Sequence, residues 1–267
     1  MRPYYFSEFS YGFAVTAEFV RDPALRIIDP PEFPSSRREG QAGGGADVRL
    51  NTPGVLTYLQ FKLSDYMCGP TAAERGLFPS KEYYRFHIRN DVTASGMTQH
   101  ELLIQLDRPG NRVYYIAPGF YYEPDWQRLY RCRQVVQNSI LFSPAELGSV
   151  DNTEDHVVAF ETADAGFGWL CSEPIRREAT AGKEALRHLK TLARRAEPIT
   201  TDRLAGEVQK LARTLEISPP DPVAVPPHTA DDLRWDRETI QGMQLATQLA
   251  SMARSHLDCT LAVVHSE

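Results

Sequence analysis

The sequence lacks the features that mark exported, membrane-spanning or cysteine-stabilised proteins. Its four cysteines lie far apart and form no Cys-x-x-Cys pair, so neither a zinc ribbon nor a disulfide framework is indicated. No apolar run approaches the roughly 18 residues that a transmembrane helix requires. The first residues also lack the apolar core of a signal peptide. We therefore expect a soluble, cytoplasmic protein with free thiols and no membrane partner.

Several short catalytic and nucleotide-binding motifs are missing as well. The sequence contains no Gly-x-Ser-x-Gly elbow, no Walker A loop, no Gly-x-Gly-x-x-Gly turn and no His-Glu-x-x-His helix. These patterns therefore give no support to a serine hydrolase, a P-loop NTPase, a dinucleotide enzyme or a zinc protease of those types.

The amino-acid composition is typical of a globular protein, and the charge is unevenly distributed along the chain. The 267 residues are 42% hydrophobic and 10% aromatic, which favours one large domain or two small ones over disorder. The formal net charge is −6, and residues 216–267 alone contribute −5 through eight acids and three basic residues. The rest of the chain is nearly neutral, which is compatible with a local basic patch.

The pattern of apolar residues and turn signals predicts a mixed α/β fold. Expected helices cover 7–20, 98–106, 125–137, 180–196, 202–215 and 231–257. Expected strands cover 25–28, 46–50, 55–63, 83–88, 111–117, 139–142, 156–160, 168–171 and 260–264. This order indicates an α/β core with a mixed sheet and an appended helical C-terminal region.

A predicted β-hairpin carries the most specific chemistry. Strands 46–50 and 55–63 are separated by the turn sequence Asn-Thr-Pro-Gly, so we expect them to pair. Gln60 and Lys62 are two residues apart and share a face, and Asp47 begins the preceding strand. Asp47 and the Gln60 amide offer oxygen ligands for Mg²⁺ or Mn²⁺, and the Lys62 ammonium can assist an attacking water. These groups suit phosphodiester hydrolysis.

This pattern, Asp47 followed by Gln60-Phe61-Lys62, resembles the PD-(D/E)XK nuclease superfamily, in the branch found in bacterial restriction and anti-phage defence proteins. The order of neighbouring elements matches from residue 7 to about 145. The resemblance implies a restriction-endonuclease-like mixed sheet flanked by helices and a Mg²⁺-dependent DNA endonuclease. It also implies a further acidic ligand, for which Glu18 is the first candidate and Glu39 the second. Gln60 departs from the commoner Glu or Asp.

The alternative function is that of a catalytically inactive nuclease-fold subunit that acts as a binding or regulatory partner in a defence complex.

We expect four segments along the chain: a nuclease core over 1–175, a partly basic helical extension over 176–216, a proline-rich linker over 217–229, and a C-terminal helix with a strand over 230–267. The apolar surface of that helix suits docking on the core, and equally suits binding a partner protein or a second copy.

Helix 180–196 is expected to carry a basic stripe. Four cations recur at helical spacing on one side: Lys183, Arg187, Lys190 and Arg194. One interpretation is that the stripe contacts nucleic-acid phosphates, in which case it should lie beside the site. The other is that it is a solvated helix face.

His87 and His100 are candidate neighbours of the site, although a lone histidine is more often a buried hydrogen-bonding group.

Overall fold

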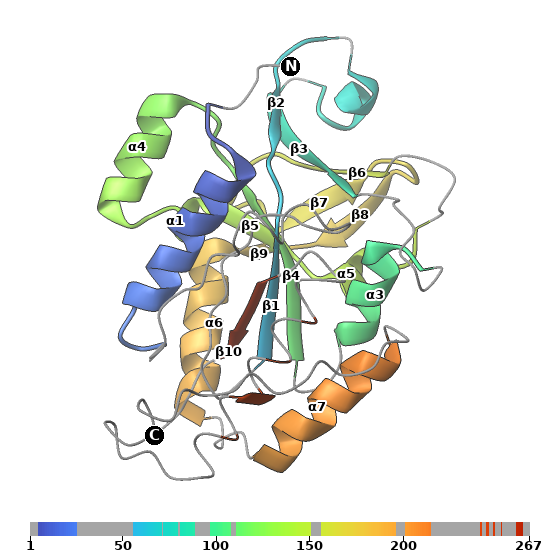
Figure 1. Cartoon of the computed structure of the whole chain (residues 1–267). Coiled ribbons are helices and arrows are strands. Elements are labelled where there is room, and N and C mark those ends of the chain that lie inside the picture. Colours follow the sequence, from blue (N-terminus) through green and yellow to red (C-terminus); the bar gives the residue numbers. More distant parts are fainter. Residues whose placement is uncertain are drawn as a thin grey trace.

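The structure, a computed structural model, contains two β-sheets with helices packed around them (Figure 1). It describes residues 5–25, 56–70, 72–79, 81–88, 97–107, 111–150, 156–195, 201–214 and 260–263, together with Gln241, Gln244, Leu245, Gln248 and Met252. The mixed α/β architecture predicted from the sequence is confirmed at this level. No helix within these ranges is both long and apolar enough to cross a membrane.

The first sheet is mixed and has five strands in the order β10-β1-β4-β5-β9. Their bounds are Leu56–Phe61 for β1, Asn111–Pro118 for β4, Ser139–Phe142 for β5, Thr180–Ala181 for β9 and Thr260–Val263 for β10. β1 and β4 are parallel, and the other neighbouring pairs are antiparallel. Because parallel neighbours need a crossover, the chain between β1 and β4 leaves this sheet before it returns.

The second sheet is antiparallel throughout, in the order β2-β3-β6-β7-β8. Its strands are Asp65–Met67 for β2, Tyr83–Ile88 for β3, His156–Phe160 for β6, Phe167–Leu170 for β7 and Ile175–Glu178 for β8. β2 and β3 both belong to the crossover between β1 and β4, so this connection supplies two of the five strands of the second sheet.

The helices begin at recognisable caps and cover both sides of the first sheet. They are α1 Glu8–Arg21, α3 Gln99–Leu106, α4 Glu123–Cys132, α5 Pro144–Leu147, α6 Gly182–Arg195 and α7 Thr201–Thr214, with short 3-10 helices at Ala73–Leu77 (η1) and Val136–Asn138 (η2). The Ser7 side chain caps α1, and Thr98 with Glu101 forms a capping box on α3. Figure 1 shows α1, α4 and α6 on one side of the molecule, and α3 and α7 on the other.

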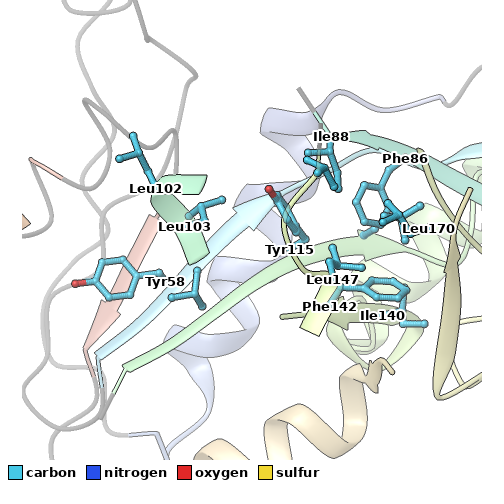
Figure 2. Close-up of a cluster of buried hydrophobic side chains, with 14 of the residues drawn as sticks. Tyr58, Phe86, Ile88, Leu102, Leu103, Tyr115, Ile140, Phe142, Leu147 and Leu170 are labelled. Atoms are coloured by element: carbon cyan, nitrogen blue, oxygen red, sulfur yellow. The ribbon is translucent and has the colours of Figure 1, made fainter. Parts of the chain in front are cut away.

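Two apolar clusters lie on opposite faces of the first sheet. The inner cluster fills the space between the sheets and beneath α3 and α7, and it includes Tyr58, Phe86, Tyr115 and Phe142 (Figure 2). The outer cluster lies under α1 and α6 and includes Leu59 and Phe61. Successive residues of β1 therefore enter different clusters, as the pleat of a strand requires.

The pairing of β1 differs from the predicted hairpin. From Leu56 to Leu59 its two edges pair with β4 and with β10, so no edge is left there for a strand at 46–50. The final strand predicted at 260–264 is confirmed as β10. Some predicted features lie outside the described residues: the strands at 25–28 and 46–50, Asp47, Glu39, the linker 217–229 and most of helix 231–257.

Two further boundaries differ from prediction. The helix expected over 125–137 ends at Cys132, because Arg133 takes a left-handed conformation with φ of 56° before η2 begins. The predicted domain boundary after residue 175 falls at the start of β8, inside the second sheet. α6 contributes Ala185 and Leu189 to the outer cluster, so it is part of the same packed body as β1.

Candidate functional site

A row of polar side chains lies at the C-terminal end of β1. Gln60, Lys62 and Ser64 are all buried, with 1%, 6% and 1% of their surface exposed. The backbone N–H of Lys62 donates to the carbonyl of Ile116 at 3.0 Å, which extends the parallel pairing with β4 past Phe61. The apolar residues that alternate with this polar row pack with the outer cluster: Leu59, Phe61 and Leu63. The alternation therefore places the polar row on the inner face, as predicted for Gln60 and Lys62.

The amide of Gln60 is the least satisfied group in this row. Its Oε1 and Nε2 atoms are both buried, and neither has a hydrogen-bond partner among the residues that the structure describes. The same holds for the hydroxyl of Ser64. Each unmade bond of this kind costs roughly 1–3 kcal/mol. A ligand that supplies a cation or an acceptor oxygen would offset that cost, so this end of β1 has the chemistry of a binding site.

Lys62 is held against an aromatic ring of the neighbouring strand. Its Nζ lies 5.5 Å from the centroid of the Tyr115 ring, within the range of a cation–π contact. Tyr115 is the residue directly beside Gln60 in the parallel ladder of β1 and β4. β4 therefore supplies the ring against which the lysine ammonium lies, from the residue beside Gln60 in the ladder.

A buried hydrogen-bonded chain continues from Tyr115. The Nε2 of His100 lies 2.8 Å from the carbonyl oxygen of Gly148, to which only an N–H can donate. With that proton placed, Nδ1 accepts the hydroxyl proton of Tyr115 across 2.9 Å. Burial lowers the pKa of His100, and the charge of Lys62 acts in the same direction. His100 is therefore a neutral group that fixes Tyr115 from behind.

His87, the other histidine noted in the sequence, lies elsewhere. It is on β3 of the second sheet, half exposed, and its Nε2 is 4.0 Å from the carboxylate of Asp65. Of these two histidines, His100 is the one that the structure joins to Lys62, through the Tyr115 side chain that both contact.

Glu18 has a different neighbourhood from the one that its predicted role requires. Its two carboxylate oxygens accept the backbone N–H groups of Val135 and Val136 at 2.6 and 2.9 Å. Burial raises the pKa of this carboxyl group in spite of those bonds. α1 and both valines belong to the outer side of the first sheet, whereas Gln60 faces the inner side. The geometry gives Glu18 the role of a cap on η2 and does not bring it to Lys62.

The basic stripe of α6 also lies on the outer side. Ala185 and Leu189 of this helix pack into the outer cluster, so the stripe and the Gln60–Lys62 pair flank opposite faces of the sheet, contrary to expectation. Three of its four cations pair with carboxylates: Lys183 with Asp164 at 2.9 Å, Lys190 with Asp22 at 2.5 Å, and Arg187 with Glu184. The side chain of Arg194 lies outside the described set. Phosphate binding by the stripe remains a prediction.

A metal ion at the row would need a carboxylate that the described ranges do not supply. In those ranges no three His, Cys, Asp or Glu side chains gather in a way that could hold a metal. The unsatisfied Oε1 of Gln60 fits one oxygen ligand of a hard cation. The resemblance implies Asp47 as the acid here, although the hairpin that would have placed it beside Gln60 is not formed, and Asp47 lies outside the described residues.

No known protein family, curated protein or solved structure matches this chain. The functional argument therefore rests on the residues themselves. Sequence reasoning identified Gln60 and Lys62 but missed Ser64, which continues the same alternation two residues later. It also missed Tyr115, whose place beside Gln60 depends on the parallel pairing of two strands that are distant in the sequence.

Proposed function

We propose that this protein is a metal-dependent nuclease that hydrolyses phosphodiester bonds of DNA, in a bacterial restriction or anti-phage role. The observation that carries the proposal is the buried, unsatisfied amide of Gln60 on the same strand face as the ammonium of Lys62. The crossover from β1 through α3 to the parallel strand β4 gives further support, since the resemblance implies a helix and a strand after the Gln-x-Lys segment.

Each group of the polar row has a chemical role in this proposal. The ammonium of Lys62 stabilises the negative charge that grows on the phosphate oxygens in the transition state. The Nε2 of Gln60 donates to a non-bridging phosphate oxygen, and its Oε1 together with Asp47 would hold Mg²⁺ or Mn²⁺. The cation, when bound, would supply Lewis-acid chemistry at the phosphate. Tyr115, fixed by His100, keeps the lysine ammonium in place.

The second candidate function is a nuclease-fold subunit that binds a partner and does not cut. Two observations favour it: Gln60 stands where an acid is commoner, and the described residues hold no three-ligand metal group. Under this alternative the polar row is a remnant, and loss of Lys62 changes no reaction.

Cleavage of supercoiled plasmid and of labelled single-stranded DNA, with Mg²⁺, Mn²⁺ or EDTA, distinguishes the two. Lys62→Ala is the decisive variant, and Lys62→Met keeps the aliphatic stem of this buried residue if alanine disturbs folding. We expect either variant to lower the metal-dependent rate by roughly 100-fold or more. Lys81→Ala is the matched control, because it removes an exposed lysine that pairs with Glu161 and belongs to neither the polar row nor the basic stripe.

Circular dichroism of each variant shows whether activity was lost without loss of fold. Full cleavage by a folded Lys62→Met protein would remove the lysine from the mechanism. Absence of cleavage by the wild type in every metal and on every substrate would favour the binding subunit.

A further inference from the structure

Exposed aromatic rings gather on one side of the molecule. In the described part of the chain, four aromatic residues are exposed: Tyr5 at 59%, Tyr122 at 50%, Phe9 at 44% and Tyr130 at 36%. All four lie on α1 or α4 or immediately before them, and Figure 1 shows these two helices next to each other. Single exposed apolar residues are normal on a protein surface, whereas a cluster of large rings marks an interaction site.

The rings line a groove of about 360 Å³ between α1 and α4. Phe9 and Phe13 come from α1, and Trp126 and Tyr130 from α4. The ring centroids of Phe13 and Tyr130 are 6.4 Å apart, and those of Trp126 and Tyr130 are 6.0 Å apart. No aliphatic side chain lines this groove, which distinguishes it from the grooves that receive the apolar face of a helix.

The groove is built on a rigid base. Trp126 stacks on Phe6 with a centroid distance of 4.6 Å, and it lies nearly parallel to Phe120 at 6.2 Å. Both of these phenylalanines are buried in the outer cluster. A ring that is already fixed loses little conformational entropy when a flat partner stacks against it.

The charge at the groove is positive. Among the residues that the structure describes, one guanidinium, that of Arg131, lines it, and no carboxylate does. The same end of α4 also carries Arg128, which pairs with Asp125, and is followed by Arg133. Neither Arg131 nor Arg133 forms an ion pair with an acid within the described ranges, and Arg131 donates to the amide oxygen of Gln127 at 3.3 Å. This charge complements a phosphate backbone.

We infer that the α1–α4 groove binds single-stranded nucleic acid, with bases stacked on Tyr130 and Phe9 and a phosphate on Arg131. Stacking on side-chain rings needs unpaired bases, which excludes an intact duplex as the occupant. The choice of polymer rests on the proposed function, because a nuclease must hold the strand on either side of the cut. Helix α4, which forms one side of the groove, follows β4, and the parallel neighbour of β4 ends at Phe61, one residue before Lys62.

Aromatic contacts extend from the groove toward that end of the sheet. Tyr122 meets Tyr5 edge to face at 6.2 Å, and the adjoining Tyr121 stacks on Tyr66 with a centroid distance of 4.1 Å. Tyr66 lies on β2, only a few residues after Lys62. Rings therefore connect the groove with β2 at the edge where β1 and β4 end, although the groove itself lies on the outer side of the sheet and the polar row on its inner face.

The test measures binding without catalysis. Fluorescence anisotropy of a labelled 20-nucleotide oligo(dT) is recorded in EDTA, with the corresponding oligo(U) and a DNA duplex for comparison. We expect Tyr130→Leu and Phe9→Leu each to weaken binding of the single strand by about tenfold, because a leucine keeps bulk but offers no ring to stack on. Arg131→Gln should lower the slope of log affinity against log salt by about 0.7, as expected for one lost phosphate contact.

Two matched controls sharpen the result. Ile175→Ala removes an exposed apolar side chain on β8, and Lys81→Gln removes an exposed lysine that pairs with Glu161 outside the groove; both should bind as the wild type does. Equal binding by wild type and the two ring variants would overturn the inference, as would no binding of either single strand or a preference for duplex. Binding of a labelled proline-rich peptide in place of oligo(dT) would reassign the groove to a protein partner.

The outcome is separable from that of the nuclease proposal. Binding of oligo(dT) is measured in EDTA, and none of the residues that line the groove belongs to the polar row, so binding and cleavage are read out independently. Failure of cleavage with intact, Tyr130-dependent binding would reject the nuclease and keep the groove. Metal-dependent cleavage, together with oligo(dT) binding that is unchanged in Tyr130→Leu, would keep the nuclease proposal and reject the groove.

Discussion

The two faces of the first sheet differ at β1, although both are equally buried. On the outer face, Leu59 and Phe61 enter an apolar cluster beneath α1 and α6. On the inner face, Gln60 and Lys62 are as deeply buried, and the Gln60 amide has no hydrogen-bond partner in the described ranges. The outer face follows the rule that governs stable cores. The inner face departs from this rule at the C-terminal end of β1. Buried polar groups that lower stability are usually retained where a functional site needs them.

The largest expected effect concerns the close packing of the start of α6 against η2 on the outer side of the sheet. At Gly182, where α6 begins, an added Cβ would lie 1.6 Å from the carbonyl oxygen of Val136 in η2. Since backbone must move to make room, we expect Gly182→Ala to lower the free energy of unfolding by about 4 kcal/mol or more, measured by urea denaturation.

The control for this variant is Gly206→Ala in α7, where an added Cβ meets nothing within 4 Å. Alanine is the better helix former there, so stability should rise by about 1 kcal/mol at most. Equal effects at Gly182 and Gly206 would show that the start of α6 is not packed against η2.

The next prediction addresses the inner face directly. Gln60→Leu replaces an unsatisfied buried amide with an apolar side chain of similar size, so we expect the free energy of unfolding to rise by roughly 1–3 kcal/mol. Nuclease activity should be lost in the same variant. The change Phe61→Gln, one residue along on the outer face, should lower stability instead. A destabilised Gln60→Leu protein would show that the amide is satisfied in the native state.

His100 makes the stability of the inner face depend on pH. An unfolded histidine protonates near pH 6.5, and burial holds the pKa of His100 below that value in the folded protein. As the pH falls below about 6.5 the unfolded state binds more protons, so the free energy of unfolding falls. His100→Gln keeps a donor for Gly148 and an acceptor for Tyr115, and should reduce this pH dependence. Identical urea midpoints against pH for both proteins would contradict the assignment.

The smallest effect belongs to the surface of α6. Lys183 is exposed, and its hydrogen bond to Asp164 raises the pKa of the ammonium. Exposed ion pairs contribute little, so Lys183→Ala should leave the urea midpoint almost unchanged. A larger loss, seen by the same denaturation, would mean that the basic stripe is a structural element of the outer side.

Local patterns in the sequence were sufficient for most single elements. The alternation at Tyr83–Ile88 gave β3 with its observed bounds, and the Thr98–Glu101 pair marks the start of α3. β8 was missed because its residues are mostly exposed and show no apolar period. The hairpin was wrong in its pairing because β10, about 200 residues away, occupies the edge of β1. Such long-range choices leave no trace in a local pattern.

The candidate site was likewise predictable where local spacing decides and unpredictable where long-range packing decides. The spacing of Gln60 and Lys62 was enough to place them on one face. The spacing did not predict their burial, since that depends on the second sheet, α3 and α7 covering this face. Glu18 had the correct charge and helix for a ligand, yet the backbone amides of Val135 and Val136, more than 100 residues later in the chain, determine where its carboxylate points.

In the proposed function, Gln60 and Lys62 form a metal-dependent site for phosphodiester cleavage. The most direct measurement is the cleavage rate of DNA across a Mg²⁺ titration, for the wild type, Gln60→Glu and Lys62→Met. We expect saturation with Mg²⁺ in the wild type and a lower half-saturating Mg²⁺ concentration for Gln60→Glu, because a carboxylate binds a hard cation better than an amide does. We also expect roughly 100-fold slower cleavage by Lys62→Met. Cleavage that is independent of Mg²⁺, or unchanged in folded Lys62→Met, would contradict the proposed function.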